Sequence, residues 1–128
     1  MINTTDNIIL DKTSLNKLLE LKPVDLGRTM MLVYSIRNNS QILADNNNKA
    51  YYSDTLCKYL DMETSQFYKF IKRLQQADII HYGPYKDTHS KLYIFNPLIA
   101  RKNENRIDSY AVSLFKNPLA DLLNANKQ

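Results

Sequence analysis

Several residue types that build common functional sites are scarce in this chain. There is one cysteine, Cys57, so the sequence holds no internal disulfide and no cysteine pair for a metal site. The two glycines, Gly27 and Gly83, stand alone and form no glycine-rich loop of the kind that cradles phosphates. The longest run without a charged residue, Leu92 to Ala100, has nine residues, less than half of what a membrane-spanning helix needs. These absences argue against nucleotide-dependent enzymes, disulfide-stapled domains and membrane proteins.

The rest of the composition is that of one ordinary globular domain. The chain has 128 residues, of which 44% are apolar and 23% charged. The first twelve residues include Asp6 and Asp11 and lack the apolar core of a signal peptide. We therefore expect a cytoplasmic protein without a membrane partner.

Positive charge is concentrated in one segment of the sequence. The chain has 17 Lys and Arg against 13 Asp and Glu, a net charge of +4. Between residues 66 and 76 there are three cations, Lys69, Lys72 and Arg73, and no acid. A locally basic helix in a nearly balanced chain is typical of a nucleic-acid-binding surface. The alternative is a solvated helix face without a ligand.

The order of elements between Ser53 and Phe95 carries the fold prediction. A capped helix, a tight turn at Asp61 and Met62, the basic helix and two β-favouring runs follow one another. This order predicts a mainly α protein with a small β-hairpin wing, a winged helix-turn-helix with additional C-terminal helices. Residues 1–22 are expected to form an arm and short helix, 23–102 the DNA-binding domain and 103–128 a helical extension. Aspartates 61 and 78 stand where such proteins often have glycine, and aspartate tolerates the left-handed conformation.

Two further helices are predicted to bury apolar faces. From Leu26 to Arg37 apolar side chains cover so much of the circumference that we expect this helix to be buried. The C-terminal stripe either packs on its own domain or forms a dimer interface, and we favour a homodimer that reads a palindromic site. The residues assigned to dimerisation are Tyr110, Leu114, Phe115, Leu119, Leu122 and Leu123.

The outward positions of the basic helix are the candidate contacts to double-stranded DNA. A glutamine amide near the helix start can pair with adenine, and arginine or lysine with guanine, while other cations contact phosphates. A loop after Tyr82 can reach an adjacent groove. The full candidate set is Ser65, Gln66, Tyr68, Lys69, Lys72, Arg73, Gln76 and Lys58, with Tyr85, Lys86, His89 and Lys91 from the loop.

Between Tyr52 and Lys102 the chain resembles a known group of proteins. The segments YSDTLCKYLDMETSQFYKFIKRLQQADIIHY and KLYIFNPLIARK look like the winged-helix replication proteins of Gram-positive plasmids and phages, the RepL-like family. The resemblance implies origin binding in replication initiation or maintenance, with host replication or transcription proteins as candidate partners. Winged helices of this kind also serve as transcriptional repressors and plasmid-partition adaptors.

Other functions are weakly supported by the sequence. His81 and His89 with Asp87 offer too few ligands for a metal site, so no metal or other cofactor is expected. Nine tyrosines suggest a stacking platform for single strands, yet most fall at core positions. Cys57 lies on an inner helix face and is expected to pack. We predict a protein that is not an enzyme, with a protein-interaction module that does not bind DNA as the alternative.

Overall fold

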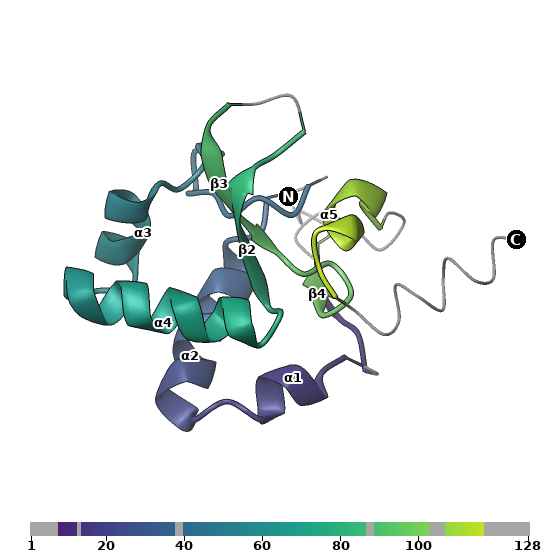
Figure 1. Ribbon diagram of the computed structural model, residues 1–128, viewed down its shortest axis with the longest axis horizontal. Coiled ribbons are helices and arrows are strands. Elements are labelled where there is room, and N and C mark those ends of the chain that lie inside the picture. Colours follow the sequence, from purple (N-terminus) through teal and green to yellow (C-terminus); the bar gives the residue numbers. More distant parts are fainter. Residues whose placement is uncertain (1–7, 13, 38–39, 87–88, 103–106, 117–128) are drawn as a thin grey trace, which may run out of the picture.

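The computed structural model describes residues 8–12, 14–37, 40–86, 89–102 and 107–116. In these ranges the chain forms five helices: α1 (Asn16–Leu19), α2 (Pro23–Tyr34), α3 (Ser53–Tyr59), α4 (Thr64–Gln76) and α5 (Ser109–Ser113). It also forms the strands β1 (Ile9–Leu10), β2 (Ile80–Pro84), β3 (Lys91–Phe95) and β4 (Ala100–Arg101). Figure 1 shows α4 across the foot of the β2–β3 hairpin, with α2 behind α4.

The predicted fold class is wrong. About 41% of the described residues are helical, in five short helices, and the strands form two separate two-stranded antiparallel sheets. The chain is therefore not a mainly α protein, and its elements give no positive sign of a winged helix. The physical reason is that backbone between α2 and α3 and after α4 is bonded as strands and bridges, and that residues 9–10 pair with residues 100–101. Of the additional C-terminal helices, α5 has five residues, and the segment 117–128 lies outside the described residues.

Local sequence signals place the helix ends. Pro23 is the first residue of α2, where its missing N–H costs no hydrogen bond. Asp61 between α3 and α4 has φ 53°, and Asp78 after α4 has φ 63°. Both aspartates therefore take the left-handed conformation expected of them. They let the chain reverse within two or three residues at each end of α4.

One apolar stripe attaches α4 to the core. Phe67, Phe70, Ile71 and Leu74 are all at most 4% exposed. They pack in the main cluster with Leu32 and with residues of α3, β2 and β3. Their spacing of three and four residues puts them on one side of the helix, so the opposite side faces solvent.

Strand β3 is bonded along both edges. On one edge β2 pairs with it from Ile80 opposite Phe95 to Pro84 opposite Lys91. On the other edge Leu43 N–H donates to Tyr93 O at 2.9 Å, and Phe95 N–H donates to Gln41 O at 2.8 Å. Between α2 and α3, residues 44–50 form a loop closed by one bridge, Ala44 to Ala50.

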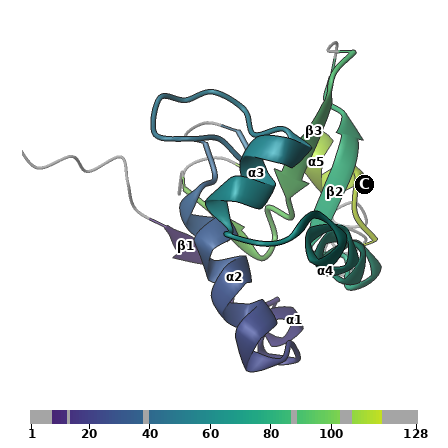
Figure 2. The same ribbon diagram turned by 90° about the vertical axis from the view of Figure 1, so that its left-hand side faces the viewer.

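The N-terminal segment pairs with a strand near the C-terminal end of the described chain. Ile9 pairs with Arg101 and Leu10 with Ala100 in an antiparallel sheet. Leu18 of α1 is 1% exposed in the main core cluster. The described part of the expected arm is thus packed against residues about ninety positions away in the sequence. Figure 2 shows β1 beside the upper end of α2.

A second apolar cluster holds α5 on the hairpin. Ala111 and Phe115 pack there with Ile42, Leu92 and Ile94. Asp108 begins the helix, and its carboxylate accepts from the backbone N–H groups of Tyr110 and Ala111. The longest helix of the described chain, α4, has 13 residues, and none of the described helices has the length and apolarity that a membrane crossing requires.

Candidate nucleic-acid interface

The outward face of α4 carries the predicted contact residues in one exposed arc. At about 100° per residue, Lys69, Lys72 and Gln76 fall at the centre of this arc. Tyr68 lies at the edge toward α3, and Gln66 at the edge toward α2. All of these side chains are exposed, as is Ser65, and α4 itself contains no acidic residue. The structure therefore brings Ser65, Gln66, Tyr68, Lys69, Lys72 and Gln76 onto one surface, which we call the α4 face.

Arg73 is placed differently from the other candidates. Its Nε donates to Asp25 Oδ2 at 2.8 Å and its Nη2 to Asp25 Oδ1 at 2.9 Å. Asp25 belongs to α2 and is only 7% exposed, so the guanidinium is turned toward α2. The hydrogen bond with Asp25 raises the pKa of Arg73. Arg73 thus joins two helices, a role that no local pattern in the sequence could show.

We expect Arg73→Ala to lower the free energy of unfolding by about 1–2 kcal/mol. The substitution leaves the buried Asp25 carboxylate without its two charge-assisted hydrogen bonds, although the half-exposed guanidinium is partly screened by water. Lys72→Ala, at the next exposed position, is the matched control and should change stability by less than about 0.5 kcal/mol. Urea unfolding followed by circular dichroism measures both. Equal values for the two variants would show that the ion pair contributes nothing to α2–α4 packing.

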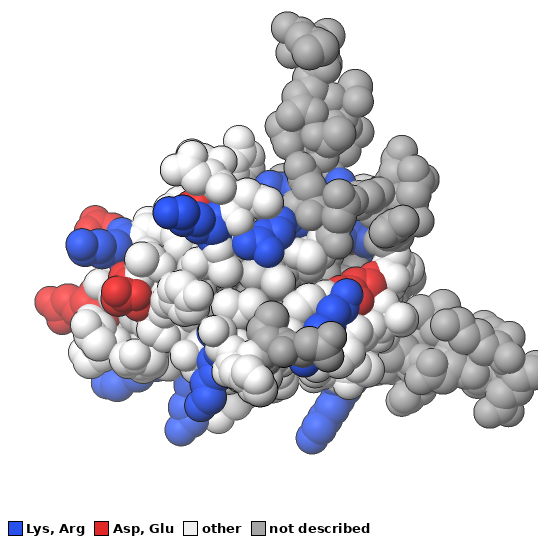
Figure 3. Space-filling view, turned by 90° about the horizontal axis from the view of Figure 1, so that it is seen from above, with Lys and Arg blue, Asp and Glu red and all other residues white. Residues whose placement is uncertain are grey.

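Acidic groups border the start of α4. Asp54, Asp61 and Glu63 are exposed on α3 and on the turn that leads into α4. Figure 3 shows acidic groups gathered at the left end of the molecule and basic groups projecting along the lower edge. The positive potential of the α4 face is therefore expected at its middle and its C-terminal half. Lys58 is exposed in the last turn of α3, next to this acidic border.

The candidates from the β2–β3 loop lie away from the α4 face. Figure 1 shows this loop and α4 at opposite ends of the hairpin. Each strand has five residues, which separates the two ends by roughly 15 Å. Lys86, His89 and Lys91 are exposed there. The predicted site is therefore divided into two surfaces.

Tyr85 is a structural residue rather than a surface contact. Its side chain is 4% exposed, and its hydroxyl donates to an Asp108 carboxylate oxygen. Its ring meets that of Tyr110 edge to face at 5.3 Å between centroids, and Lys86 Nζ lies 5.2 Å from its centroid. The ring and hydroxyl of Tyr85 therefore hold α5 on the hairpin, and the DNA contact predicted for this residue stays a prediction.

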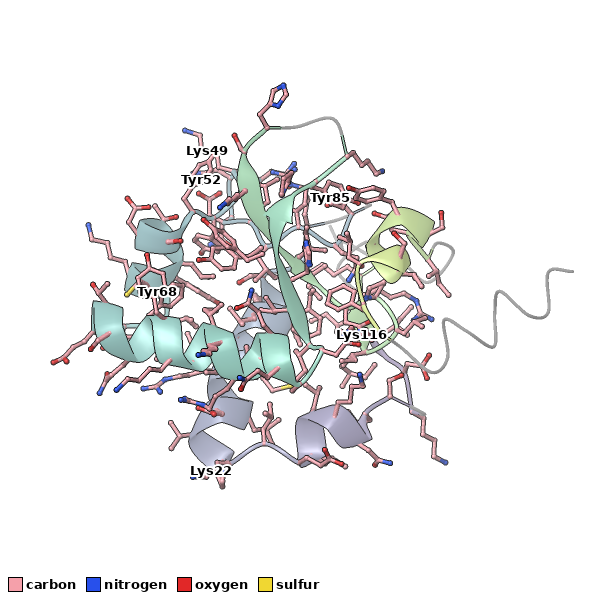
Figure 4. All side chains as sticks on the ribbon, in the orientation of Figure 1. Lys22, Lys49, Tyr52, Tyr68, Tyr85 and Lys116 are labelled. Carbon is pink, nitrogen blue, oxygen red and sulfur yellow. The ribbon has the colours of Figure 1, made fainter. Side chains whose placement is uncertain are left out.

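Sequence reasoning missed one cation at the loop end of the hairpin. Lys49 closes the 45–49 loop, where Asp45 Oδ1 accepts from the N–H groups of Asn47 and Lys49. Figure 4 shows Lys49 near the same end of the hairpin as the β2–β3 loop. The signal available in the sequence was the run of turn-forming residues at 45–48, which predicts a turn next to Lys49.

The C-terminal residues assigned to a dimer interface are divided by the structure. Phe115 is 7% exposed and packs in the second cluster, with Leu114 partly buried against it. Tyr110 lies against Tyr85. The apolar side of α5 is thus covered within the chain, as the alternative expectation of intrachain packing stated. Leu119, Leu122 and Leu123 lie outside the described residues.

The histidines and the cysteine have ordinary surroundings. The ring of His81 lies 6.3 Å from that of Phe115, centroid to centroid, and burial lowers its pKa. Within the described ranges no three His, Cys, Asp or Glu side chains gather as a metal site requires, and Asp87 lies outside those ranges. Cys57 is partly buried, and its thiol donates to Met62 O at 3.0 Å.

Comparison with protein-family models, curated proteins and solved structures found no match for this chain. The resemblance to plasmid replication proteins therefore stays a prediction from the sequence.

Proposed function

We propose that this protein binds double-stranded DNA in a sequence-specific manner through the α4 face. The observation that supports the proposal is the exposure of Lys69 and Lys72 at the centre of a face without acids, beside Gln66 and Gln76. An α-helix fits the major groove, where glutamine amides can pair with adenine. Lysines that neutralise phosphates supply affinity without specifying sequence.

The biological role follows from the resemblance alone. We propose action in plasmid or phage replication initiation or maintenance, with transcriptional repression or partition as the alternative. This role requires binding and no covalent chemistry, and it agrees with a cytoplasmic location. Host replication or transcription proteins are its candidate partners. The position of the bound site, in repeats or in a promoter, separates initiator from repressor.

The direct test is charge reversal on the α4 face. Lys69→Glu with Lys72→Glu should weaken binding to duplex DNA from around the protein's own gene by about tenfold or more at low salt. Because two phosphate contacts are lost, the slope of log K against log salt should become shallower by about 2. Fluorescence anisotropy between 50 and 200 mM salt measures both quantities. Arg73 is left unchanged because its ion pair with Asp25 links α4 to α2.

The control has the same change of net charge elsewhere. Lys12→Glu with Lys22→Glu alters two exposed lysines that lie before and at the start of α2. This variant should keep most of the affinity and nearly the same salt dependence. If both variants lose binding equally, net charge rather than the α4 face determines affinity. If the wild-type protein binds no duplex at 50 mM salt, the proposal fails and the α4 face is a solvated surface.

A further inference from the structure

A small cavity continues the α4 face beyond the C-terminal end of the helix. It has a volume of about 460 Å³ and lies between the last turn of α4, β2 and α5. Gln75 and Gln76 line it from α4, His81 lines it from β2, and Lys116 lines it from the segment after α5. Because Gln76 also belongs to the α4 face, the cavity and the α4 face form one surface. Figure 4 shows Lys116 beside this end of α4.

Lys116 supplies the positive charge of this cavity at neutral pH. It is exposed, and among the described residues it forms no ion pair. Burial lowers the pKa of His81, so its imidazole is neutral at pH 7. The acid in the lining, Asp78, is already paired with Lys17 at 3.3 Å. An anionic ligand therefore meets one uncompensated cation here, next to the amides of two glutamines.

The opposite end of α4 does not suit an anionic ligand. Three exposed acids, Asp54, Asp61 and Glu63, border the first turn of the helix. Gln66 lies in that turn, about 15 Å from Gln76 along the helix axis. The two glutamines therefore lie in surroundings of opposite charge. A duplex bound at the C-terminal end of α4 keeps its phosphates away from the three acids.

The edge of α4 toward α2 is also less suited to phosphates. Arg73 is bound there by Asp25. The outer side of α2 is exposed, although the sequence predicts a buried helix: Val24 is 64% exposed and Met30 is 38% exposed. That prediction is therefore wrong for one side of the helix. These apolar side chains offer phosphates no hydrogen-bond donor. The cation at this edge is Lys22, which precedes α2.

We propose that DNA lies along the C-terminal half of α4 and over the cavity, with Lys116 as a phosphate contact and Gln76 as a residue that reads a base. Both roles rest on the proposed binding of duplex DNA through the α4 face. Lys72 and Gln76 are four residues apart, so they are neighbours on the helix surface, and Gln76 shares the cavity with Lys116. A base edge at Gln76 therefore has a lysine for the adjoining phosphates on either side. Base recognition moves from Gln66, near the start of α4, to the other end of the helix.

Charge reversal at Lys116 tests the phosphate contact. Lys116→Glu should weaken binding to duplex DNA from around the protein's own gene by about fivefold or more at 50 mM salt. The slope of log K against log salt should become shallower by about 1. Lys116→Arg keeps the charge and should bind as the wild type does. Fluorescence anisotropy between 50 and 200 mM salt measures both quantities, and circular dichroism checks that each variant is folded.

The matched control changes the net charge by the same amount on the side of α2. Lys22→Glu alters an exposed lysine at the N-cap of α2. It should keep most of the affinity and nearly the same slope. If Lys22→Glu flattens the slope and Lys116→Glu does not, the DNA lies toward α2 and the proposal is overturned.

Alanine at each glutamine tests which end of α4 reads bases. The binding of each variant is measured on duplexes that carry single base-pair changes in the bound site. Gln76→Ala should lose about tenfold of the discrimination at one position. This loss should exceed that of Gln66→Ala by at least about threefold. A larger loss in Gln66→Ala would place base recognition at the start of α4 and overturn the proposal.

Failure of this proposal differs from failure of the proposed function. If Lys116→Glu has no larger effect than Lys22→Glu, the surface ends with α4 and the proposal is wrong. The proposed function still stands in that case if reversal of Lys69 and Lys72 weakens binding. If the wild-type protein binds no duplex at 50 mM salt, both are wrong.

Discussion

Tyr93→Ala should lower the free energy of unfolding by about 3–5 kcal/mol, the range for removing a large buried aromatic side chain. Tyr93 is 1% exposed and stands where three elements meet. Its ring stacks on Tyr82 of β2 with centroids 4.4 Å apart and meets Phe67 of α4 edge to face at 6.1 Å. Its hydroxyl shares a 2.6 Å hydrogen bond with Ser53 Oγ at the start of α3. The alanine variant would leave a cavity between the hairpin and both helices, and chemical denaturation measures the loss.

Tyr93→Phe separates the ring from the hydroxyl. It should lower stability by only about 1 kcal/mol, since it removes one hydrogen bond. Burial raises the pKa of Tyr93 to about 12 from the ordinary 10.0, so the unfolded chain releases this proton first. Stability from Tyr93 is therefore complete below pH 10 and is lost as the pH rises toward 12. The phenylalanine variant should lack this part of the alkaline loss. Equal stability of the alanine and phenylalanine variants would show that the ring is not part of the core.

The sequence alone predicted those features of the fold that depend on neighbouring residues. The basic helix was predicted, and the spacing of Phe67, Phe70, Ile71 and Leu74 is the local signal that fits the buried side of α4. Aspartates 61 and 78 stand where glycine was the usual residue, and both take the left-handed conformation that aspartate tolerates. The β2–β3 hairpin was also predicted from two β-favouring runs, although Gly83 and Pro84 belong to β2 and pair with Leu92 and Lys91.

The sequence failed where contacts join distant residues. Nothing near Ile9 indicates that it pairs with Arg101, because a two-residue strand has no periodicity to detect. The class prediction failed for the same reason, since long-range pairing such as the bridge of Ile42 to Ile94 leaves no local signal in the sequence. Spacing also could not tell Arg73 from Lys72. The two residues differ because Arg73 donates hydrogen bonds to the buried Asp25, which lies 48 residues away in the sequence.

These failures change how the candidate site is understood. With Arg73 bound to Asp25 and Tyr85 buried, the cations open to a ligand on α4 are Lys69 and Lys72. Two phosphate contacts per copy would make the DNA-binding constant only weakly dependent on salt, far less than for a protein with six to ten contacts.

Asn96→Ala should lower the free energy of unfolding by about 2–4 kcal/mol, because it removes one buried and one partly buried hydrogen bond and leaves their backbone partners unpaired. Asn96 is fully buried, its Nδ2 donates to Asp78 O at 2.9 Å, and its Oδ1 accepts from Leu98 N–H at 3.0 Å. The side chain thereby ties the left-handed turn after α4 to the segment that leads into β4. Asn47→Ala, on the exposed 45–49 loop, is the control and should change stability by less than about 0.5 kcal/mol. Asn96→Asp keeps the shape and the acceptor but turns an oxygen toward Asp78 O, so its stability should recover as acid protonates it. A loss in Asn96→Ala no larger than in Asn47→Ala would show that β4 and β1 are held without this residue.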